Sequence, residues 1–454
     1  MSITNPTILL TAGATTYTFS GEDVISASLV EEVNPISIEL PYNVLEVKVY
    51  NTDPALSVFS SDCVLSERLP VDCYESIDGV SQYLGKFYLD TFVNTNDYTL
   101  ELRAFDAIGV MSKTDYDGGF WSTPTSLLLI LNQVLLSKGY VFAVDDSIKD
   151  TTIQGWNPPG DLRGALQQIC FAAGAVASCA RDNKVVITPV NLPYKMFDAR
   201  VRDSQKLSNQ PTELLKVVTS IELVSHSYTA GTELQTIFDE YLEAGQHKIV
   251  FNQPYYDIVI DGPGFIPVTL GFEDDADFVF EDGAYLEISG EYAFDSPNSV
   301  RLDMQEAGQV TITGYPWIDS KRSFLFFETG LPDYSNKNAL VISEATMVSE
   351  AYAQTVLDRV RDYYRQRYKQ TFTLLPSAIK PLDLVSSNTV YGKTVLGFVQ
   401  KMESNLMGGY LQITDIRGIE PVYVQPVEHP VRRARSDIAI CGADLTRNNG
   451  FRRY

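Results

Sequence analysis

The sequence contains three histidines, the side chains that most often carry acid–base chemistry near neutral pH. They are His226, His247 and His429. None stands in an HExxH motif, whose spacing places two zinc ligands on one helix face, and none accompanies a GxSxG turn. The histidine pattern therefore indicates neither a metalloprotease nor a serine hydrolase. We expect no catalytic residue and no enzymatic activity.

A cluster of acidic residues between positions 273 and 282 could bind a metal ion, because Ca²⁺ takes several carboxylate oxygens. The cluster lacks the glycine and the terminal glutamate of an EF-hand loop, and a solvated acidic loop is the simpler interpretation. We therefore expect no metal and no cofactor. A glycosidase pair cannot be singled out among 58 acidic residues. The cluster comprises Glu273, Asp274, Asp275, Asp277, Glu281 and Asp282.

Four arginines lie in the stretch 349–367, whose apolar residues recur with the period of a helix. Asp358 and Asp362 stand three or four positions from several of them, at the spacing of intrahelical ion pairs. The arginines could instead reach acids across a subunit boundary. Exposed pairs contribute little to stability, so we prefer the intrahelical interpretation. The four residues are Arg359, Arg361, Arg365 and Arg367.

A second arginine-rich stretch closes the chain. From residue 432 onward there are six arginines and two aspartates, a local charge of +4 on a protein whose net charge is −23. A solvated tail is one interpretation. The other is a basic arm that binds an acidic surface of a partner, since a guanidinium can hold a carboxylate with two hydrogen bonds. The predicted partner-binding residues are Arg432, Arg433, Arg435, Arg452 and Arg453.

The composition excludes several classes of protein. Of the 454 residues, 44% are hydrophobic and 20% are charged, which argues against disorder. The negative net charge argues against sequence-specific nucleic-acid binding, which needs a basic face. No apolar run approaches the roughly 20 residues that span a bilayer, and the amino terminus lacks a basic n-region. We expect a protein made in a cytoplasm, with five cysteines present as free thiols.

The elements that would position these residues are mainly strands. The stretch 24–51 alternates apolar and polar residues in three runs, interrupted at Asn34-Pro35 and Pro41, which predicts a three-stranded meander. Further strands are predicted at 8–10, 17–19, 83–90, 98–106, 184–188, 215–226, 248–251, 258–260, 284–288, 310–314, 324–327, 371–374, 396–402 and 409–416. Helices are predicted at 122–139, 161–173 and 349–367.

The order of several motifs resembles the tail hub proteins of phages and phage-like particles. This family includes the baseplate hub of contractile tails and the amino-terminal hub portion of siphophage tail-associated lysins. The resemblance covers about 20–425 and depends on motif order and spacing. The matching motifs are EEVNP at 31–35, ISIELP at 36–41, LEVKVYNTD at 45–53, LGKFYLD at 84–90, AFDAI at 104–108, ALQQICFAAGA at 165–175 and AQTVLDRVRDYYRQR at 353–367.

The resemblance implies a structural hub protein: a homotrimeric ring at the distal end of the tail. Such a ring matches the hexameric tube or distal tail protein ring to the trimeric tip and lines an axial channel. The implied partners are the distal tail or tube protein, tail tip, fibre or spike proteins, and the tape measure protein. DNA would pass through the channel without sequence-specific binding. The implied location is the virion tail. Siphophage relatives often carry a lysin or fibre extension after the hub; we expect none here, because the sequence ends about thirty residues past the hub-like region.

The expected fold class is α+β, mainly β, with two tail-tube-like β-barrels, a small α+β insert and one long helix in the second half. We predict a first barrel at 1–111, completed by about 191–225, and the insert at 112–190. A β-rich domain would follow at 226–345, then a helix and strands completing the second barrel at 346–430, and the arm at 431–454. One alternative is a receptor- or carbohydrate-binding tip protein that stacks sugars on aromatic rings. Its candidate rings are Tyr255, Tyr256, Tyr285, Tyr292, Tyr315 and Trp317. A cell-wall hydrolase with unassigned carboxylates is a further alternative.

Overall fold

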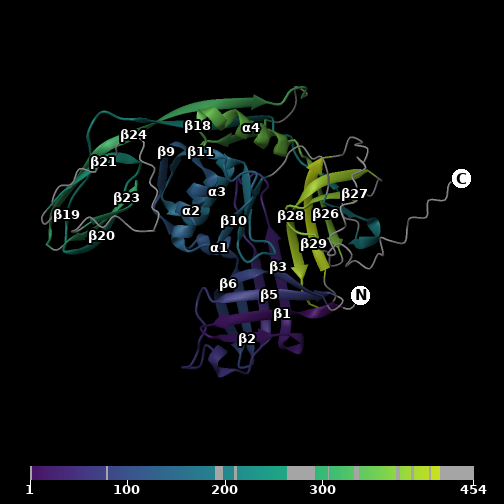
Figure 1. Ribbon diagram of the computed structural model, residues 1–454. Coiled ribbons are helices and arrows are strands. Elements are labelled where there is room, and N and C mark those ends of the chain that lie inside the picture. Colours follow the sequence, from purple (N-terminus) through teal and green to yellow (C-terminus); the bar gives the residue numbers. More distant parts are fainter. Residues whose placement is uncertain are drawn as a thin grey trace. The chain divides into compact units, whose positions relative to one another are not determined.

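The computed structural model describes residues 3–77, 80–189, 198–208, 212–262, 292–304, 306–331, 337–374, 379–389, 393–407 and 411–419. The chain divides into two compact units, each assembled from separate segments (Figure 1). Unit 1 comprises Met1–Val110, Val176–Val217 and Asp362–Tyr454, and unit 2 comprises Met111–Ala175 and Val218–Arg361. No helix among the described residues is long and apolar enough to cross a membrane.

Unit 1 is built almost entirely from strands. Its strands are β1 Ile3–Ala12, β2 Thr15–Phe19, β3 Val24–Glu32, β4 Val44–Tyr50, β5 Pro70–Ile77, β6 Val80–Asn96, β7 Thr99–Phe105, β13 Ala175–Ser178, β14 Val185–Pro189, β15 Ala199–Val201, β16 Lys206–Ser208, β17 Thr212–Leu214, β26 Tyr368–Leu374, β27 Leu384–Asn388, β28 Thr394–Asn405 and β29 Leu411–Ile419. The short helix α1 Ala107–Met111 and the 3-10 turns η1 Gly21–Asp23, η2 Pro54–Leu56 and η4 Asp203–Gln205 connect them.

Fourteen of these strands form one sheet with two separate hydrophobic cores. The main order is β16-β26-β29-β28-β3-β4-β7-β6-β5-β1-β2. One core lies under β1 to β7 and includes Leu10 and Phe87, whereas the other lies under β26 to β29 and includes Phe372 and Val399. The antiparallel pairing of β28 with β3 joins the two halves, so strands far apart in the sequence continue one sheet.

The predicted three-stranded meander is wrong in its middle strand. Residues 33–43 form turns, and β3 pairs directly with β4. The side chain of Asn34 accepts a hydrogen bond from the Ile36 amide, and Ser37 has a φ of 53°, so the backbone cannot continue a ladder there. Ile36 and Leu40 are nevertheless buried. Burial alone explains why these residues are apolar. Their alternation with polar residues had suggested a strand.

Unit 2 contains three of the four α-helices of the described chain. Its elements are β8 Asp115–Tyr116, β9 Gly119–Ser126, α2 Leu127–Val134, η3 Leu136–Lys138, β10 Phe142–Val144, β11 Thr152–Asn157, β12 Gly160–Asp161, α3 Leu162–Ala173, β18 Ser220–Ala230, β19 Gln235–Leu242, β20 Gly245–Val250, β21 Tyr255–Asp261, β22 Tyr292–Ser296, β23 Ser299–Met304, β24 Gly308–Phe327, β25 Ala339–Ile342 and α4 Glu350–Tyr364, whose last residues belong to unit 1.

The predicted start of the first helix is wrong. Residues Gly119–Ser126 form β9, which pairs with β11, and α2 begins at Leu127 with the Ser126 side chain as its N-cap. The Thr-Pro-Thr run is therefore extended, in keeping with the restriction that proline imposes on the residue before it. The predicted helix at 161–173 is confirmed, with Asp161 as its N-cap and Gly174 in the left-handed region at its end.

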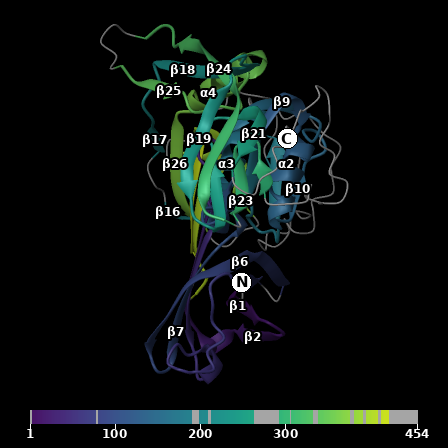
Figure 2. The ribbon, with the colours of Figure 1, turned by 90° about the vertical axis from the view of Figure 1, so that its left-hand side faces the viewer.

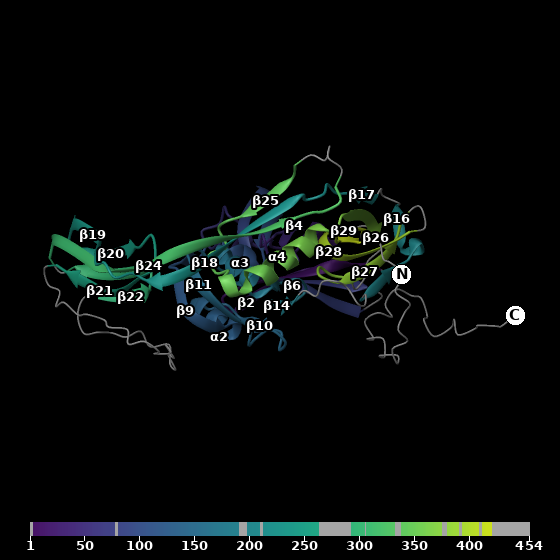
Figure 3. The ribbon, with the colours of Figure 1, turned by 90° about the horizontal axis from the view of Figure 1, so that it is seen from above.

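The long strand β24 organises the rest of unit 2. Its first half pairs with β19 and β21, and its second half pairs with β18 over eleven residue pairs. Sequence patterns had indicated two short strands, at 310–314 and 324–327, within this single element. Helix α4 lies beside β18 and β24 (Figures 2 and 3), and Arg361 stacks over the ring of Phe326 at 5.8 Å.

The predicted class, α+β and mainly β, is confirmed. Barrel closure and the predicted domain boundaries remain predictions. Strands β15, β16 and β17 lie in the segment 191–225, which was predicted to complete the first barrel. β15 pairs in parallel with β27, whereas β16 and β17 pair with β26.

Candidate functional site

One face of the unit 1 sheet, lined by both polar and apolar residues, is a candidate surface. It forms a groove of about 890 Å³. Successive side chains of a strand point to opposite faces of the sheet. In these strands, every second residue faces a core, and the residues between them face the groove. The lining residues with polar or charged side chains are Ser26, Ser28, Glu46, Lys48, Thr91, Glu101, Arg103, Thr373, Glu403, Ser404 and Asn405.

The charges of the groove are arranged in cross-strand pairs. Lys48 Nζ lies 2.7 Å from Glu101 Oε1, and Arg103 Nε lies 3.4 Å from Glu46 Oε1. Both pairs join directly opposed residues of β4 and β7. The groove lining has three carboxylates and two basic groups, and the third carboxylate, Glu403, lies 2.8 Å from the Nζ of Lys401, so each carboxylate has a basic partner. Such a surface can contact water or a polyanion without holding it tightly.

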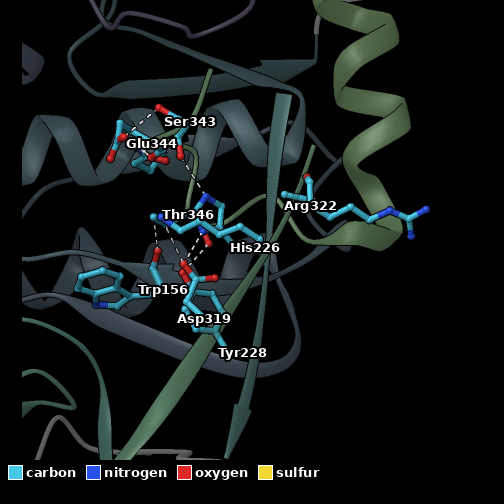
Figure 4. Close-up of polar contacts among 11 residues, drawn as sticks. Trp156, His226, Tyr228, Asp319, Arg322, Ser343, Glu344 and Thr346 are labelled. Atoms are coloured by element: carbon cyan, nitrogen blue, oxygen red, sulfur yellow. Dashed lines mark hydrogen bonds and ion pairs between the residues drawn. The ribbon is translucent and has the colours of Figure 1, made fainter. Parts of the chain in front are cut away.

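Of the two histidines that the structure describes, His226 in unit 2 has the larger number of hydrogen-bond partners (Figure 4). The side chain is buried, and its Nδ1 lies 2.8 Å from Asp319 Oδ2 while its Nε2 lies 3.1 Å from the carbonyl oxygen of Ser343. Both ring nitrogens thus lie within hydrogen-bond distance of an oxygen atom. No hydroxyl contacts either ring nitrogen among the described hydrogen bonds, so His226 is not poised to activate a nucleophile.

His226 instead holds the segment 343–348, which leads from β25 into α4. The amide of His226 donates to the carbonyl of Val348, and the Tyr228 hydroxyl donates to the carbonyl of Thr346 at 3.3 Å. The hydroxyl of Thr346 donates in turn to the carbonyl of Trp156 at 2.5 Å. These bonds satisfy the polar backbone of an irregular, buried segment. The constellation is structural and fixes the start of α4.

Of the remaining histidines, the acidic cluster and the basic arm, the structure describes only His247. His247 is partly exposed and contacts the carbonyl oxygen of Glu243 at 2.8 Å. His429, the acidic cluster 273–282 and the basic arm 431–454 lie outside the described residues. No group of three or more potential metal ligands occurs among the residues that the structure describes.

The helix arginines follow two different patterns. Arg361 pairs with Asp358 at 2.6 Å, as the intrahelical interpretation predicts. The interpretation is wrong for Arg359, which donates to the carbonyl of Phe171, and for Arg367, which donates to the carbonyl of Leu215 at 2.8 Å. A prediction of ion pairs from residue spacing cannot find these contacts, because every residue has a backbone carbonyl and the sequence does not show which one an arginine contacts.

The candidate sugar-stacking residues are mostly occupied by one another. Tyr255 is buried. Tyr256 stacks on Tyr315 at 5.5 Å and contacts Trp317 at 5.4 Å, and Trp317 contacts Phe120 at 4.9 Å. Ring faces that pack on each other are not open to a sugar. Tyr285 and the side chain of Tyr292 lie outside the described residues.

Comparison with known proteins gives a fold. No protein-family model matches the sequence, and no curated protein matches it significantly. Among solved structures, the tail protein from Neisseria meningitidis is similar with a TM-score of 0.51 and 9% identity, over 91% of this chain and 96% of that chain. A 43 kDa tail protein of prophage MuSo2 from Shewanella oneidensis has a TM-score of 0.48 and 10% identity, over 90% and 98%. The prophage tail protein gp18 from Listeria monocytogenes has 0.48 and 8%, over 92% and 95%.

The fold of this chain is therefore that of a tail protein, as the first of these structures shows over nearly the whole length of both chains. At 9% identity the likeness concerns the fold alone. It agrees with the resemblance to tail hub proteins that the sequence motifs indicate.

Proposed function

We propose that the protein is a structural hub at the distal end of a phage or phage-like tail, where three copies form a ring around an axial channel. The continuous sheet of unit 1 carries this proposal. Two separate cores lie under one sheet, so each copy would bring two strand-built modules to the ring. Three copies then offer six modules, the number needed to meet a hexameric tube.

The groove face is the part of the proposed ring that lines the channel. A channel wall must be polar and must not retain the nucleic acid that passes it. The cross-strand pairs of β4 and β7 neutralise four of the groove's charges, and the third carboxylate, Glu403, is paired with Lys401 at 2.8 Å. The groove is therefore less acidic than the net charge of the whole protein suggests.

Among the described strands, the main path of the unit 1 sheet ends at β2 and β16. These edge strands also support assembly into a ring, because a sheet edge invites pairing with another chain. The distal tail or tube protein, the tape measure protein and the tip, fibre or spike proteins are the proposed neighbours. The role requires no catalytic group. The hydrogen bonds of His226 fit a structural part, and the proposal accordingly includes no enzymatic activity.

The oligomeric state tests the proposal. Light scattering of the protein released from particles should give the mass of three 50.6 kDa chains. A stable monomer or dimer would count against the ring. Exchange of the charge signs at one groove pair, Lys48→Glu with Glu101→Lys, should leave the mass unchanged because the pair is retained. Lys48→Glu alone replaces a positive charge by a negative one, which changes the charge of the groove by −2. Assembly should remain intact in this variant too if this face borders the channel.

A further inference from the structure

A buried group of charged side chains lies in unit 1, and neither the groove nor the cores account for it. Glu31 from β3 and Glu75 from β5 are 1% and 2% exposed. Arg181, from the turn between β13 and β14, reaches Glu31, with its Nη2 3.5 Å from the Glu31 Oε2. Arg181 also interacts electrostatically with Glu75 and with Asp383, which precedes β27. Four segments of the chain thus meet around one guanidinium.

The two buried glutamates of this group, Glu31 and Glu75, share one guanidinium, that of Arg181. Among the residues that the structure describes, none donates a hydrogen bond to either carboxylate oxygen of Glu75 or to the Oε1 of Glu31. An ionised carboxylate without a donor in a buried site is strongly unfavourable. A proton on one of the two carboxyl groups removes this excess charge and leaves the Glu31–Arg181 pair intact.

The electrostatics agree with a proton on Glu75. Burial raises the pKa of Glu75 to about 7, with Arg181 opposing the rise and Glu31 adding to it. Burial likewise raises the pKa of Asp383 to about 6, against the effects of Lys380 and Arg181 and with that of Asp198. Cys73, two positions before Glu75, is buried, and burial raises its thiol pKa far above neutrality.

The turn that carries Arg181 is held in place by this group. Arg181 has a φ of 57°, in the left-handed region that a side chain disfavours. The turn is also tied to β6, because the amide of Lys86 donates to the carbonyl of Asp182 at 3.4 Å. A contact that keeps a residue in a disfavoured conformation must itself be favourable, so weakening the ion pair should release the turn.

We propose that Glu31, Glu75, Arg181 and Asp383 form a pH-sensitive latch that closes the β13–β14 turn onto the unit 1 sheet while Glu75 is protonated. When Glu75 ionises, two carboxylates compete for Arg181 and the turn opens. The proposal goes beyond the hub function and does not depend on it.

The direction of the effect follows from the raised pKa of Glu75. In the open form this carboxyl group is solvated and has a pKa of about 4.3. Between about pH 5 and pH 7 the closed form therefore binds one more proton than the open form. The latch is most stable below this range, and the opening equilibrium constant should rise by about tenfold per pH unit until it levels off above pH 7. Asp383 acts in the same direction at lower pH.

Amide hydrogen exchange of the full chain tests the latch. After correction for the intrinsic pH dependence of exchange, protection of Lys86 and of residues 180–184 should fall steeply from pH 5 to pH 7. Glu75→Gln keeps the shape and removes the titration, so the protection should stay high across this range. Glu22→Gln, at an exposed position, should keep the parental pH dependence.

Two outcomes would overturn the latch. One is protection in the parent protein that does not change with pH. The other is a fall in protection that persists unchanged in Glu75→Gln. Circular dichroism of each variant at pH 5 checks that the fold is retained, and Glu31→Gln provides a second route if Glu75→Gln is poorly folded. With Glu31 uncharged, Glu75 alone can pair with Arg181, so the fall in protection should again disappear.

Discussion

The guanidinium of Arg359 in α4 occupies the space that a side chain on Gly174 would need. Gly174 ends α3 with a φ of 75°, and Arg359 donates a hydrogen bond to the carbonyl of Phe171 in the last turn of that helix. The last carbonyls of a helix lack partners within it and carry partial negative charge. A partly buried arginine from one helix thus caps another helix of unit 2.

Replacement of Gly174 by alanine should destabilise unit 2 by about 2–4 kcal/mol, because the left-handed backbone and the guanidinium both resist a Cβ atom. Gly139 is a matched control. It also has a left-handed φ, of 80°, but a Cβ atom there would contact nothing. Gly139→Ala should therefore cost only about 1 kcal/mol. Denaturant unfolding measures both, and equal losses would mean that Arg359 does not restrict this site.

Replacement of Arg359 by methionine tests the cap from the other side. Burial lowers the pKa of Arg359 to about 10. Loss of the charged donor should cost about 1–3 kcal/mol in the free energy of unfolding. Arg361→Met on the same helix removes a more exposed pair with Asp358 and should cost under about 1 kcal/mol. A larger loss at Arg361 than at Arg359 contradicts the cap.

His226→Ala should destabilise unit 2 by about 2–4 kcal/mol, because it leaves Asp319 and the carbonyl of Ser343 without their buried donor. Exchange of amides near the start of α4 should accelerate as the segment 343–348 loosens. His247→Ala, at a more exposed position, should change stability by less than about 0.5 kcal/mol. If both variants unfold at the same denaturant concentration as the parent, the segment does not depend on His226.

The basic arm gives a prediction that rests on sequence alone. Truncation at His429 should leave the hub folded but weaken its assembly into particles, since the six arginines after it would no longer reach an acidic partner surface. The contribution of the arm should shrink as salt rises, because screening weakens the attraction. Equal assembly of truncated and intact protein at low ionic strength indicates a solvated tail.

Some elements could be predicted from the sequence because local signals decided them. Helix α3 has an aspartate at its N-cap, a glycine after its end and a clear apolar stripe, and it forms as expected. The prediction of a middle strand in the meander was wrong because an apolar residue such as Ile36 can be buried in a turn as well as in a strand. Similarly, α2 starts late because the pairing of β9 with β11 outweighs the helix signal at Thr123-Pro124.

The candidate sites depended on contacts that sequence spacing does not encode. Glu31 and Arg181 are 150 positions apart, and nothing local marks either as buried. Arg359 stood at the right distance from Asp362 for an ion pair, yet it reaches a carbonyl in another helix. Alternation did mark Glu46, Lys48, Glu101 and Arg103 as the polar face of their strands. Their meeting across β4 and β7 required the register.

Imaging of assembled particles by electron cryomicroscopy tests the central claim most directly. The account predicts a ring of three copies at the distal end of the tail, with the groove residues Glu46, Lys48, Glu101 and Arg103 facing the axial channel. A reconstruction that places the protein away from the tail axis, in another copy number, or with this face turned outward contradicts the account.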